Sequence, residues 1–420
     1  MGAVTQSERI LTLDVLRGVA VMGIFSVNVI SFAMPEAAYF NPAAYGGTHG
    51  ASLAVWAANF VLVDGKMRGL FSLLFGASAL LVIQRAEAAG LDPRRVHFRR
   101  MAWLLVFGLC HFFLLWYGDI LTLYAVMGFL LWPFRNKPVR TLLLWAGGLL
   151  VLDLALMGFF GWAFIAAEAA ATAPQANAAA IATWQGMAGD FMPPSAEALA
   201  RDLALYRGSW AGIVAHRAAT DWSDPLMQLA FGTAETLGYM LLGMAGLKSG
   251  FLTGTWEPRR YRRIGAMGLA VGIPGFALLG WNDWRTGFRT SILFADFFAV
   301  ATPFRLAMMA GYAALIVLFA RRPGWLRDRI AAAGRAAFTN YLGASLLASL
   351  LFDGYGLGVF GRLTRWEAWL VAPLFWAIML LWSKPWLERY RYGPFEWAWR
   401  SLARWSPQPM RRPAAAAVPA

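Results

Sequence analysis

Residues 108–128 read GLCHFFLLWYGDILTLYAVMG, and this stretch decides the kind of fold. It has the pattern of the end of one membrane-spanning helix, a short turn at Tyr117-Gly118, and the start of the next helix. Two ionisable residues, His111 and Asp119, lie in this otherwise apolar run. Because an ionisable side chain is costly to bury in hydrocarbon, such residues are by default candidates for a functional site.

The composition of the whole chain agrees with a membrane location. Of its 420 residues, 59% are hydrophobic and only 14% are charged. The apolar residues come in runs of roughly 20, the length that a helix needs to cross about 30 Å of hydrocarbon. Many of the 21 Trp residues lie near the ends of these runs, as expected at membrane interfaces. We therefore predict an all-α, polytopic transmembrane helical bundle in a lipid bilayer.

We predict ten spans in two membrane halves, residues 1–163 and 225–405. An extracytoplasmic helical loop, 164–224, separates the halves, and a Pro- and Ala-rich tail, 406–420, is expected to be disordered. The predicted spans are 15–34, 67–87, 98–116, 119–134, 141–163, 226–247, 264–281, 303–320, 336–353 and 366–383. The apolar stretch 51–63 is too short to cross the membrane and is predicted to form an interfacial or re-entrant helix. Whether 288–301 crosses or is also re-entrant is left open.

The positive charge of the chain is distributed in a way that predicts orientation. The formal net charge is +14. Lys and Arg cluster in alternate loops, around 85–100, 135–140, 248–263 and 321–335 and in the C-terminal tail, whereas the other loops hold few. Because cytoplasmic loops carry the excess of Lys and Arg, both termini are predicted to be cytoplasmic. The charge is then a topology signal, and no nucleic-acid partner is expected.

Several kinds of site are missing from the sequence. The single cysteine, Cys110, excludes an intramolecular disulfide. No P-loop occurs, and no cluster of His, Cys and carboxylates has metal-ligand spacing. We expect no metal site.

The first span carries three polar residues. Asp14 and Arg17 are three residues apart and therefore adjacent on a helix, and Asn28 lies near the same face. They would form a polar stripe facing the bundle interior. Alternatively, Asp14 and Arg17 form a structural ion pair and Asn28 hydrogen-bonds a neighbouring helix.

Three charged residues precede the second predicted span. Asp64 and Arg68 are four residues apart, which favours a local ion pair. Lys66, between them, is a candidate for binding an anionic group.

His111 lies eleven residues beyond Arg100, or about 16–17 Å further along a helix, beyond the membrane midplane. A neutral imidazole there can accept a proton from a hydroxyl or amine, or attack an acyl carbon. Asp119 is close enough in sequence to orient the ring. The alternative is a histidine that only packs between helices. The other polar residues inside spans, which Arg305 or another span could satisfy structurally, are Asp153, Glu235, Asn340 and Tyr341.

Several motifs in fixed order resemble those of a known family. They are the first span RILTLDVLRGVAVMGIFSVNVISF (9–32), PEAAYFNPAAYGG (35–47), KMRGLFSLLFG (66–76), the 108–128 hairpin, GYMLLGMAGLKSG (238–250), GRAAFTNYL (334–342) and RYRYGPFEWAWR (389–400). On these motifs the chain is identified as a member of the bacterial YeiB-like membrane proteins, whose C-terminal region is a domain of unknown function. The resemblance runs from residue 9 to about 405, except through 164–224, and implies a multi-pass protein of the bacterial inner membrane.

The first-span pattern LDVLRG followed by Asn28 is also similar to that of the heparan-α-glucosaminide N-acetyltransferases and wider transmembrane acyltransferases. This resemblance implies an enzyme that moves an acyl group from cytoplasmic acyl-CoA, such as acetyl-CoA, to an extracytoplasmic glycan, lipid or small-molecule acceptor. The active histidine of those proteins follows the first span, where this chain has His49; the YeiB-like pattern resembles this chain at His111 instead.

The roles that we assign follow from this resemblance. The catalytic group would be His111, oriented by Asp119 or Asp14. Arg17 and Lys66 would hold the acyl-CoA co-substrate, and substrate would contact Asn28, Asn340 and Tyr341. Assembly as a homodimer is left open.

Two other functions are compatible with the sequence. A transporter or flippase for a small solute or lipid would use Asp153, Glu235 and His111 as a proton or substrate relay. The chain has no internal repeat and no matched pair of broken helices, the usual signs of alternating access. A non-catalytic membrane scaffold is the third. The 164–224 loop is either a structured connector or a lid over an outward-facing site.

Overall fold

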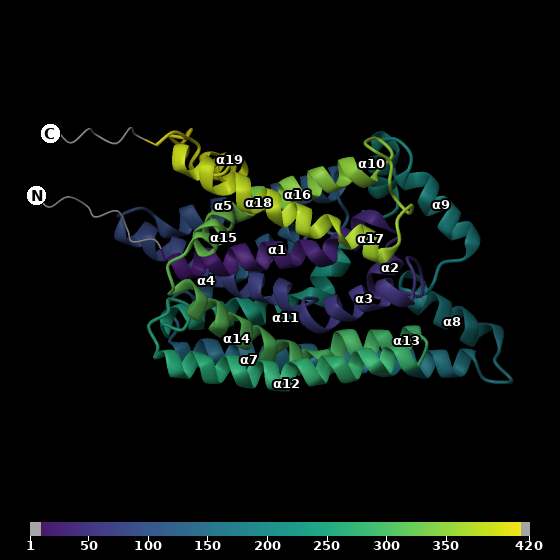
Figure 1. The fold of residues 1–420 in the computed structure, drawn as a ribbon. Helices are drawn as coiled ribbons and strands as arrows, with labels where there is room; N and C mark the ends of the chain where they lie inside the picture. The colour runs from purple at the N-terminus through teal and green to yellow at the C-terminus, as the bar shows by residue number, and fades with distance from the viewer. Residues whose placement is uncertain (1–9, 413–420) are drawn as a thin grey trace, which may run out of the picture.

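The computed structural model describes residues 10–412, and this part of the chain is a bundle of helices without a β-strand (Figure 1). The first half contains α1 (Leu11–Ala33), α2 (Ala37–Phe40), α3 (Gly50–Leu62), α4 (Lys66–Ala88), α5 (Pro93–Leu114), α6 (Leu121–Leu130), the 3₁₀ turn Trp132–Phe134 and α7 (Val139–Ala171). The segment that follows contains α8 (Ala178–Ala188), the 3₁₀ turn Gly189–Phe191, α9 (Ala196–Tyr206) and α10 (Trp210–Ala219).

The second half begins with α11 (Asp224–Lys248) and α12 (Pro258–Arg285). It continues with α13 (Thr290–Phe294), a π-helical segment (Ala295–Val300), α14 (Ala301–Ala320), α15 (Trp325–Arg335), α16 (Ala337–Phe352), α17 (Arg365–Trp369), α18 (Val371–Arg389) and α19 (Pro394–Arg404). Each of the ten predicted spans therefore overlaps a helix.

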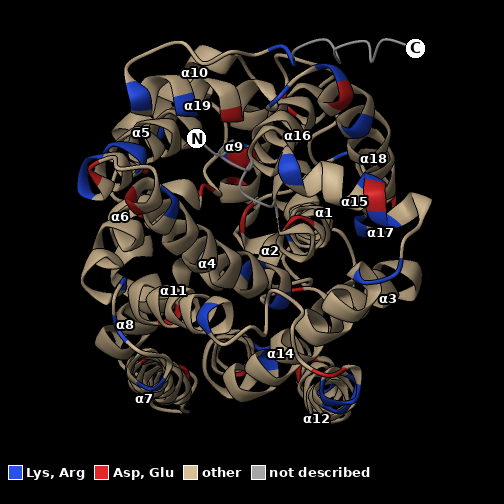
Figure 2. Cartoon of the chain, turned by 90° about the vertical axis from the view of Figure 1, so that its left-hand side faces the viewer, with Lys and Arg blue, Asp and Glu red and all other residues tan. Residues whose placement is uncertain are grey.

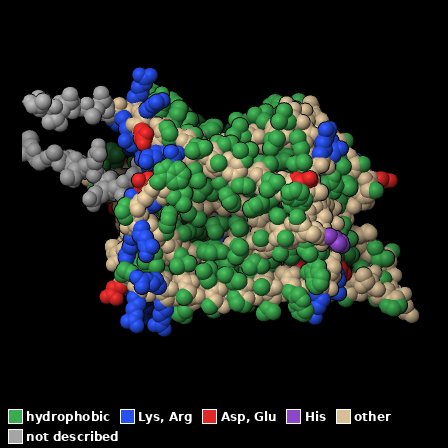
Figure 3. Space-filling view, viewed as in Figure 1, with side chains coloured by type: hydrophobic (Ala, Val, Ile, Leu, Met, Phe, Trp, Pro, Cys, Tyr) green, Lys and Arg blue, Asp and Glu red, His purple; other side chains and the backbone are tan. Residues whose placement is uncertain are grey.

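Within residues 10–412, six helical segments are long and apolar enough to cross a membrane. They are Leu11–Ala33, Gly50–Ala88, Val139–Ala171, Pro258–Arg285, Thr290–Ala320 and Arg365–Arg389. Helices α6 and α16 are also apolar but shorter. Figure 3 shows a broad hydrophobic band with Lys and Arg gathered mainly along the edge near the termini. The molecule thus has the surface of a multi-pass membrane protein, while the number of crossings and the orientation remain predictions.

The two short apolar stretches belong to longer segments. Helix α3 covers the predicted 51–63 stretch and is followed directly by α4; the two form a 39-residue apolar segment interrupted at Gly65, whose φ is 70°. The 288–301 stretch becomes α13 and the π-helical segment, which run on into α14. The wider π-helical turns directly precede Pro303, whose ring would otherwise disturb a regular α-helix.

Helix α1 lies inside the bundle, and α7 and α12 lie at its periphery (Figure 2). Glycines allow the close approach of α1 to α15, since a Cβ on Gly18 would lie 2.1 Å from the Ile330 carbonyl oxygen. Helix α7 instead exposes large apolar side chains, including Val151, Phe159 and Trp162. This face suits contact with lipid.

The segment after α7 lies against the end of the 108–128 hairpin. Ser195 caps α9 by accepting a hydrogen bond from the Ala198 N–H at 3.2 Å. Trp210 of α10 donates its Nε1–H to the Leu114 carbonyl at 2.7 Å, and Gln228 donates to the Asp119 carbonyl at 2.7 Å. Helix α10 therefore covers one end of the hairpin.

Part of the tail that we predicted to be disordered is placed in the structure. The Arg412 N–H donates to the Arg389 carbonyl at 3.1 Å, and Trp397 donates to the Gln408 carbonyl at 2.7 Å. These bonds hold residues 406–412 against α18 and α19. Residues 413–420 of that prediction lie outside the described residues.

Candidate functional site

The hairpin at residues 108–128 turns between Leu114, the last residue of α5, and Leu121, the first of α6. The N–H groups of Leu115 and Trp116 both donate to the His111 carbonyl, which closes the end of α5. Asp119 Oδ2 accepts the Thr122 N–H at 2.8 Å. A carboxylate at the N-terminus of a helix is favoured by the free N–H groups there, so Asp119 fixes the start of α6.

His111 lies between Asp119 and a serine that the sequence analysis missed. Its Nδ1 is 2.8 Å from Asp119 Oδ1, and its Nε2 is 3.0 Å from Ser345 Oγ on α16. All three residues are buried. An ionised carboxylate only accepts hydrogen bonds, so in a neutral imidazole beside it Nδ1 carries the hydrogen and Nε2 is the nitrogen that can accept from the serine hydroxyl. This order of carboxylate, imidazole and hydroxyl is the arrangement used in nucleophilic catalysis.

The Ser345 hydroxyl has a second acceptor within reach. Its Oγ lies 3.2 Å from the carbonyl oxygen of Tyr341, one helical turn earlier. The single hydroxyl hydrogen can therefore point to His111 or to the backbone. Proton transfer to His111 requires the first orientation.

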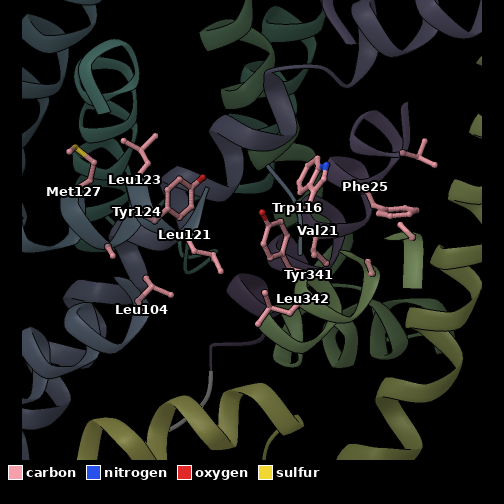
Figure 4. Close-up of a cluster of buried hydrophobic side chains, with 14 of the residues drawn as sticks. Val21, Phe25, Leu104, Trp116, Leu121, Leu123, Tyr124, Met127, Tyr341 and Leu342 are labelled. Carbon is pink, nitrogen blue, oxygen red and sulfur yellow. The ribbon is translucent and has the colours of Figure 1, made fainter. Parts of the chain in front are cut away.

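A small cavity lies beside this group. It is lined by Asn28, Tyr341 and Ser345 together with the side chains of Val21, Ile24, Phe25, Phe32, Ala344 and Met379. The Tyr341 ring centroid is 5.2 Å from that of His111, and the Trp116 ring is 6.0 Å from it. Figure 4 shows Trp116 and Tyr341 in the same buried cluster as Val21 and Phe25. Two of the residues predicted to contact substrate, Asn28 and Tyr341, thus both line the cavity beside His111.

Asn340, the third predicted substrate residue, is engaged elsewhere. Its Nδ2 donates to the Ala333 carbonyl at 2.9 Å and lies 3.2 Å from Ser383 Oγ, and its Oδ1 accepts from Trp382 Nε1 at 2.8 Å. The amide is therefore used in packing α16 against α18. It does not line the cavity.

Asp14 and Arg17 form the ion pair that we named as the structural alternative. Arg17 Nη1 lies 2.9 Å from Asp14 Oδ1, and Nη2 donates to Ser78 Oγ at 2.9 Å. They lie near the start of α1, whereas Asn28 lies near its end. Of the two carboxylates predicted to orient His111, Asp119 makes the contact.

Lys66 lies in a different environment from the one expected for a residue that binds acyl-CoA. The side chain is fully buried, its Nζ donates to the Phe60 carbonyl, and the ammonium lies 2.9 Å from the centroid of the Phe276 ring. Phe60 is in the last turn of α3, whose carbonyls have no helical partner, so the lysine caps this helix end. A phosphate at the molecular surface would not reach it.

Arg68 pairs with Glu235 rather than with Asp64. Arg68 Nη2 and Arg305 Nη1 each lie 2.5 Å from one oxygen of Glu235, which joins α4, α11 and α14. Asp64 instead accepts from the Tyr39 hydroxyl at 3.2 Å. The local pair fails because α4 begins at Lys66, so Asp64 lies before the helix.

A second and larger cavity lies on another side of α1. It encloses about 620 Å³, open space included, and is lined mainly by aromatic side chains from α2, α3 and residues 290–298. Its polar lining includes Tyr39 and Asn41, both from the PEAAYFNPAAYGG motif, and Asp64, Asn59 and Arg365. Within residues 10–412, no group of three or more His, Cys, Asp or Glu side chains could hold a metal ion.

Comparisons with known proteins agree with the motifs. Residues 246–406 match the family described as "Protein of unknown function (DUF418)". Uncharacterized protein YxaH of Bacillus subtilis is 32% identical over 97% of both chains. Uncharacterized protein YeiB of Escherichia coli is 32% identical over 94% of this chain and 96% of its own. An uncharacterized 39.9 kDa protein from Bacillus acidopullulyticus is 26% identical over 96% of each chain. No solved structure matches.

Proposed function

The chain belongs to the YeiB-like family of membrane proteins, and from that premise we propose that it is an integral-membrane acyltransferase. In this proposal ten spans cross the bacterial inner membrane with both termini in the cytoplasm. The donor is a cytoplasmic acyl-CoA, such as acetyl-CoA. The acceptor is a hydroxyl or amine of an extracytoplasmic glycan or lipid. The observation that carries the proposal is the contact of His111 with both Asp119 and Ser345.

The first half-reaction transfers the acyl group to the protein. His111 Nε2 takes the proton of Ser345 Oγ while this oxygen attacks the carbonyl carbon of the thioester. The carbon–sulfur bond then breaks, and the thiol leaves with the proton that His111 returns. An acyl ester on Ser345 results. Asp119 holds the Nδ1–H and stabilises the imidazolium that forms transiently.

The second half-reaction frees the serine. The acceptor hydroxyl or amine loses its proton to His111 Nε2 and attacks the ester carbonyl carbon. The Ser345 oxygen leaves and takes that proton back. Asn28 and Tyr341, which line the cavity beside Ser345, are the residues placed to position the reacting group. The aromatic side chains around His111 exclude water, which would otherwise hydrolyse the ester.

Acyl transfer from acetyl-CoA by the purified protein tests this proposal, with release of the free thiol as the readout. His111→Ala is expected to lower the rate by about 10²–10⁴-fold, the usual contribution of a general base. Ser345→Ala should abolish formation of the acyl-protein. Wild-type protein that neither binds nor turns over any acyl-CoA would contradict the proposal.

Ser349→Ala is the matched control. Ser349 lies one turn further along α16, is also buried, and lies 3.4 Å from the Leu115 carbonyl without touching His111. It should retain the wild-type rate. An equal loss of acyl-transfer rate in Ser345→Ala and Ser349→Ala would mean that serines on this helix act through packing.

The contacts of Glu235 and His111 give less support to the alternative function, a transporter with a proton or substrate relay. Glu235 is held by Arg68 and Arg305, and both ring nitrogens of His111 are engaged with Asp119 and Ser345. A proton relay needs groups that exchange partners, whereas Glu235 is held between two guanidinium groups. Proton-coupled solute uptake in proteoliposomes that is lost in Asp153→Asn would favour transport.

A further inference from the structure

The larger of the two cavities lies at the end of the bundle opposite the termini, where α2, α3, α13 and α17 gather (Figure 1). It encloses about 620 Å³, open space included, and half of its lining residues are aromatic. It shares no lining residue with the cavity beside Ser345. The cavity is therefore a separate site, and in the predicted orientation it lies towards the extracytoplasmic side.

Aromatic rings from separate segments line this cavity. The ring of Phe40 in α2 lies 5.4 Å from that of Phe191 and 5.3 Å from that of Phe297, measured between centroids. In α3, Trp56 stacks on Phe60 with the centroids 5.2 Å apart. Such rings suit the apolar body of a ligand, and their faces also attract an ammonium group.

The two amides in the lining are already engaged. Asn41 donates to the Phe288 carbonyl at 3.2 Å, and Asn59 donates to the Ser26 carbonyl at 3.3 Å. The oxygen of each amide also accepts an N–H. These bonds make both amides part of the frame of the cavity. The two charged residues of the lining have hydrogen-bonding capacity left.

Arg365 is a buried cation without a counter-charge. The residue is only 2% exposed. Its Nη2 donates to the Ala38 carbonyl at 2.6 Å and lies 3.4 Å from the Tyr45 carbonyl oxygen. Within residues 10–412, its Nε has no hydrogen-bond partner and no carboxylate pairs with the guanidinium. Because a buried cation is costly unless it is paired, this group is suited to an anion from outside the chain.

Asp64 brings the opposite charge to the same cavity. Its Oδ1 accepts the Tyr39 hydroxyl at 3.2 Å, and in the described part of the chain it forms no ion pair. Two cations nearby, Lys66 and Arg305, hydrogen-bond to other groups. An ionised carboxylate accepts several hydrogen bonds, so Asp64 can take a further donor.

We propose that this cavity binds a small zwitterion, a molecule that joins a primary ammonium and an anionic group to an apolar body. The anionic group lies at Arg365, the ammonium at Asp64, and the apolar body against the aromatic rings. The two charged residues line one cavity without pairing, and such a ligand supplies the missing partner of each. An apolar pocket with a few placed polar groups is the usual form of a small-molecule site. This site does not depend on the proposed acyl transfer.

The test is calorimetric titration of the full-length protein in dodecyl maltoside, a detergent with an uncharged head group. The probes are phenylalanine and the dipeptide alanyl-phenylalanine, which carry the same two charges at different separations. At least one should bind about tenfold or more tightly than two analogues that each lack one charge. These are phenethylamine, without the anionic group, and 3-phenylpropionate, without the ammonium. Equal affinity for all four compounds would overturn the proposal.

Each charged residue should affect only the probes that carry its counter-charge. Arg365→Gln should weaken the binding of the zwitterion and of 3-phenylpropionate about tenfold and leave phenethylamine unchanged. Asp64→Asn should weaken the zwitterion and phenethylamine and leave 3-phenylpropionate unchanged. Arg362→Gln, an exposed arginine three residues earlier, is the matched control and should bind every probe as wild type does.

These variants also separate charge from shape. Because Arg365 bonds the Ala38 carbonyl, retained affinity for phenethylamine is the check that Arg365→Gln is folded. An equal loss of affinity for all probes in both Arg365→Gln and Asp64→Asn would show that the two residues act through the shape of the cavity and would overturn the assignment. The comparison of probes on wild type needs no variant.

A zwitterion of this kind has two sources, a free amino acid or short peptide and the head group of phosphatidylethanolamine, which carries a phosphate and an ammonium. Dihexanoyl phosphatidylethanolamine is therefore titrated in parallel. If it binds, is weakened by Arg365→Gln and Asp64→Asn, and the two free probes do not bind, the site is supported and its ligand is a lipid. If neither the free probes nor the lipid binds, the proposal is overturned, whatever the acyl-transfer rate of His111→Ala.

Discussion

His111 Nδ1 lies 2.8 Å from Asp119 Oδ1, across a turn that separates the two residues by eight positions. The other oxygen of the same carboxylate accepts the Thr122 N–H. One side chain therefore fixes both the start of α6 and the tautomer of the imidazole. The geometry of the turn and the orientation of the His111 ring depend on the same residue.

Asp119→Asn should separate these two roles. The asparagine oxygen can still accept the Thr122 N–H, so the melting temperature should change little. Its amide cannot stabilise an imidazolium at His111 as a carboxylate does, and it favours the wrong tautomer. We expect acyl transfer to fall by about 10²-fold or more, measured as thiol release from acetyl-CoA at saturating donor.

The alanine variant at the same position provides the check on this explanation. Asp119→Ala should lose both activity and stability. Equal melting temperatures for the Asn and Ala variants would contradict a role of Asp119 in holding α6.

The contacts predicted correctly from the sequence are mostly local. His111 and Asp119 are joined by one short hairpin, and Asp14 and Arg17 are adjacent on one helix, so spacing alone indicates both pairs. Ser345 is 234 residues from His111, and a serine inside a span commonly bonds to its own backbone. Nothing in the sequence distinguishes it from Ser349.

The break between α3 and α4 explains why the predicted Asp64–Arg68 pair is wrong. Helical spacing predicts an Asp64–Arg68 pair only if one helix contains both, but the helix starts at Lys66 after Gly65 in a positive-φ conformation. The true partner of Arg68, Glu235, is 167 residues away on α11. Contacts between spans depend on how the bundle assembles, which no local pattern encodes.

Glu235→Gln should destabilise the protein strongly. The carboxylate lies between Arg68 and Arg305, and the change leaves two cations close together without their shared counter-charge. Breaking a buried ion pair in this way costs about 3–5 kcal/mol. We expect a clear fall in the thermal unfolding temperature of the detergent-purified protein.

The control for this change is Glu197→Gln, the same substitution on the exposed first turn of α9. Its unfolding temperature should stay near that of wild type. If Glu235→Gln also unfolds at the wild-type temperature, the two arginines must have other means of charge compensation.

The segment that covers the hairpin should depend on pH through Asp202 of α9. Burial raises the pKa of this carboxyl, Asp221 adds to the rise, and His216 and Arg201 oppose it. An acid with a raised pKa in the folded state binds its proton more tightly there than in the unfolded chain. Its contribution to stability is therefore fully present below about pH 4 and is lost as pH rises through the raised pKa.

Asp202→Asn keeps the side chain uncharged at every pH. The difference in unfolding temperature between Asp202→Asn and wild type should therefore grow in favour of the variant as pH rises from 4 (roughly the ordinary pKa of Asp) towards neutrality. Measuring the difference between the two proteins cancels the pH dependence that they share. A difference that stays constant with pH would show that the burial of Asp202 does not penalise its charge.

Glu396 of α19 should control the stability of the helix that carries Ser345. Its Oε1 accepts the Phe338 N–H at 2.7 Å and the Thr339 N–H at 3.1 Å, both in the first turn of α16. Hydrogen bonds to a charged group contribute about 1.5–3 kcal/mol each, and a carboxylate also suits the positive end of a helix. Glu396→Ala should lower the unfolding temperature more than Glu396→Gln, which keeps an oxygen for the two N–H groups. Because α16 also positions Ser345 against His111, acyl transfer should fall in the same order, alanine below glutamine. An alanine variant that is destabilised but transfers acyl groups at the wild-type rate would show that the start of α16 and the Ser345–His111 contact are independent.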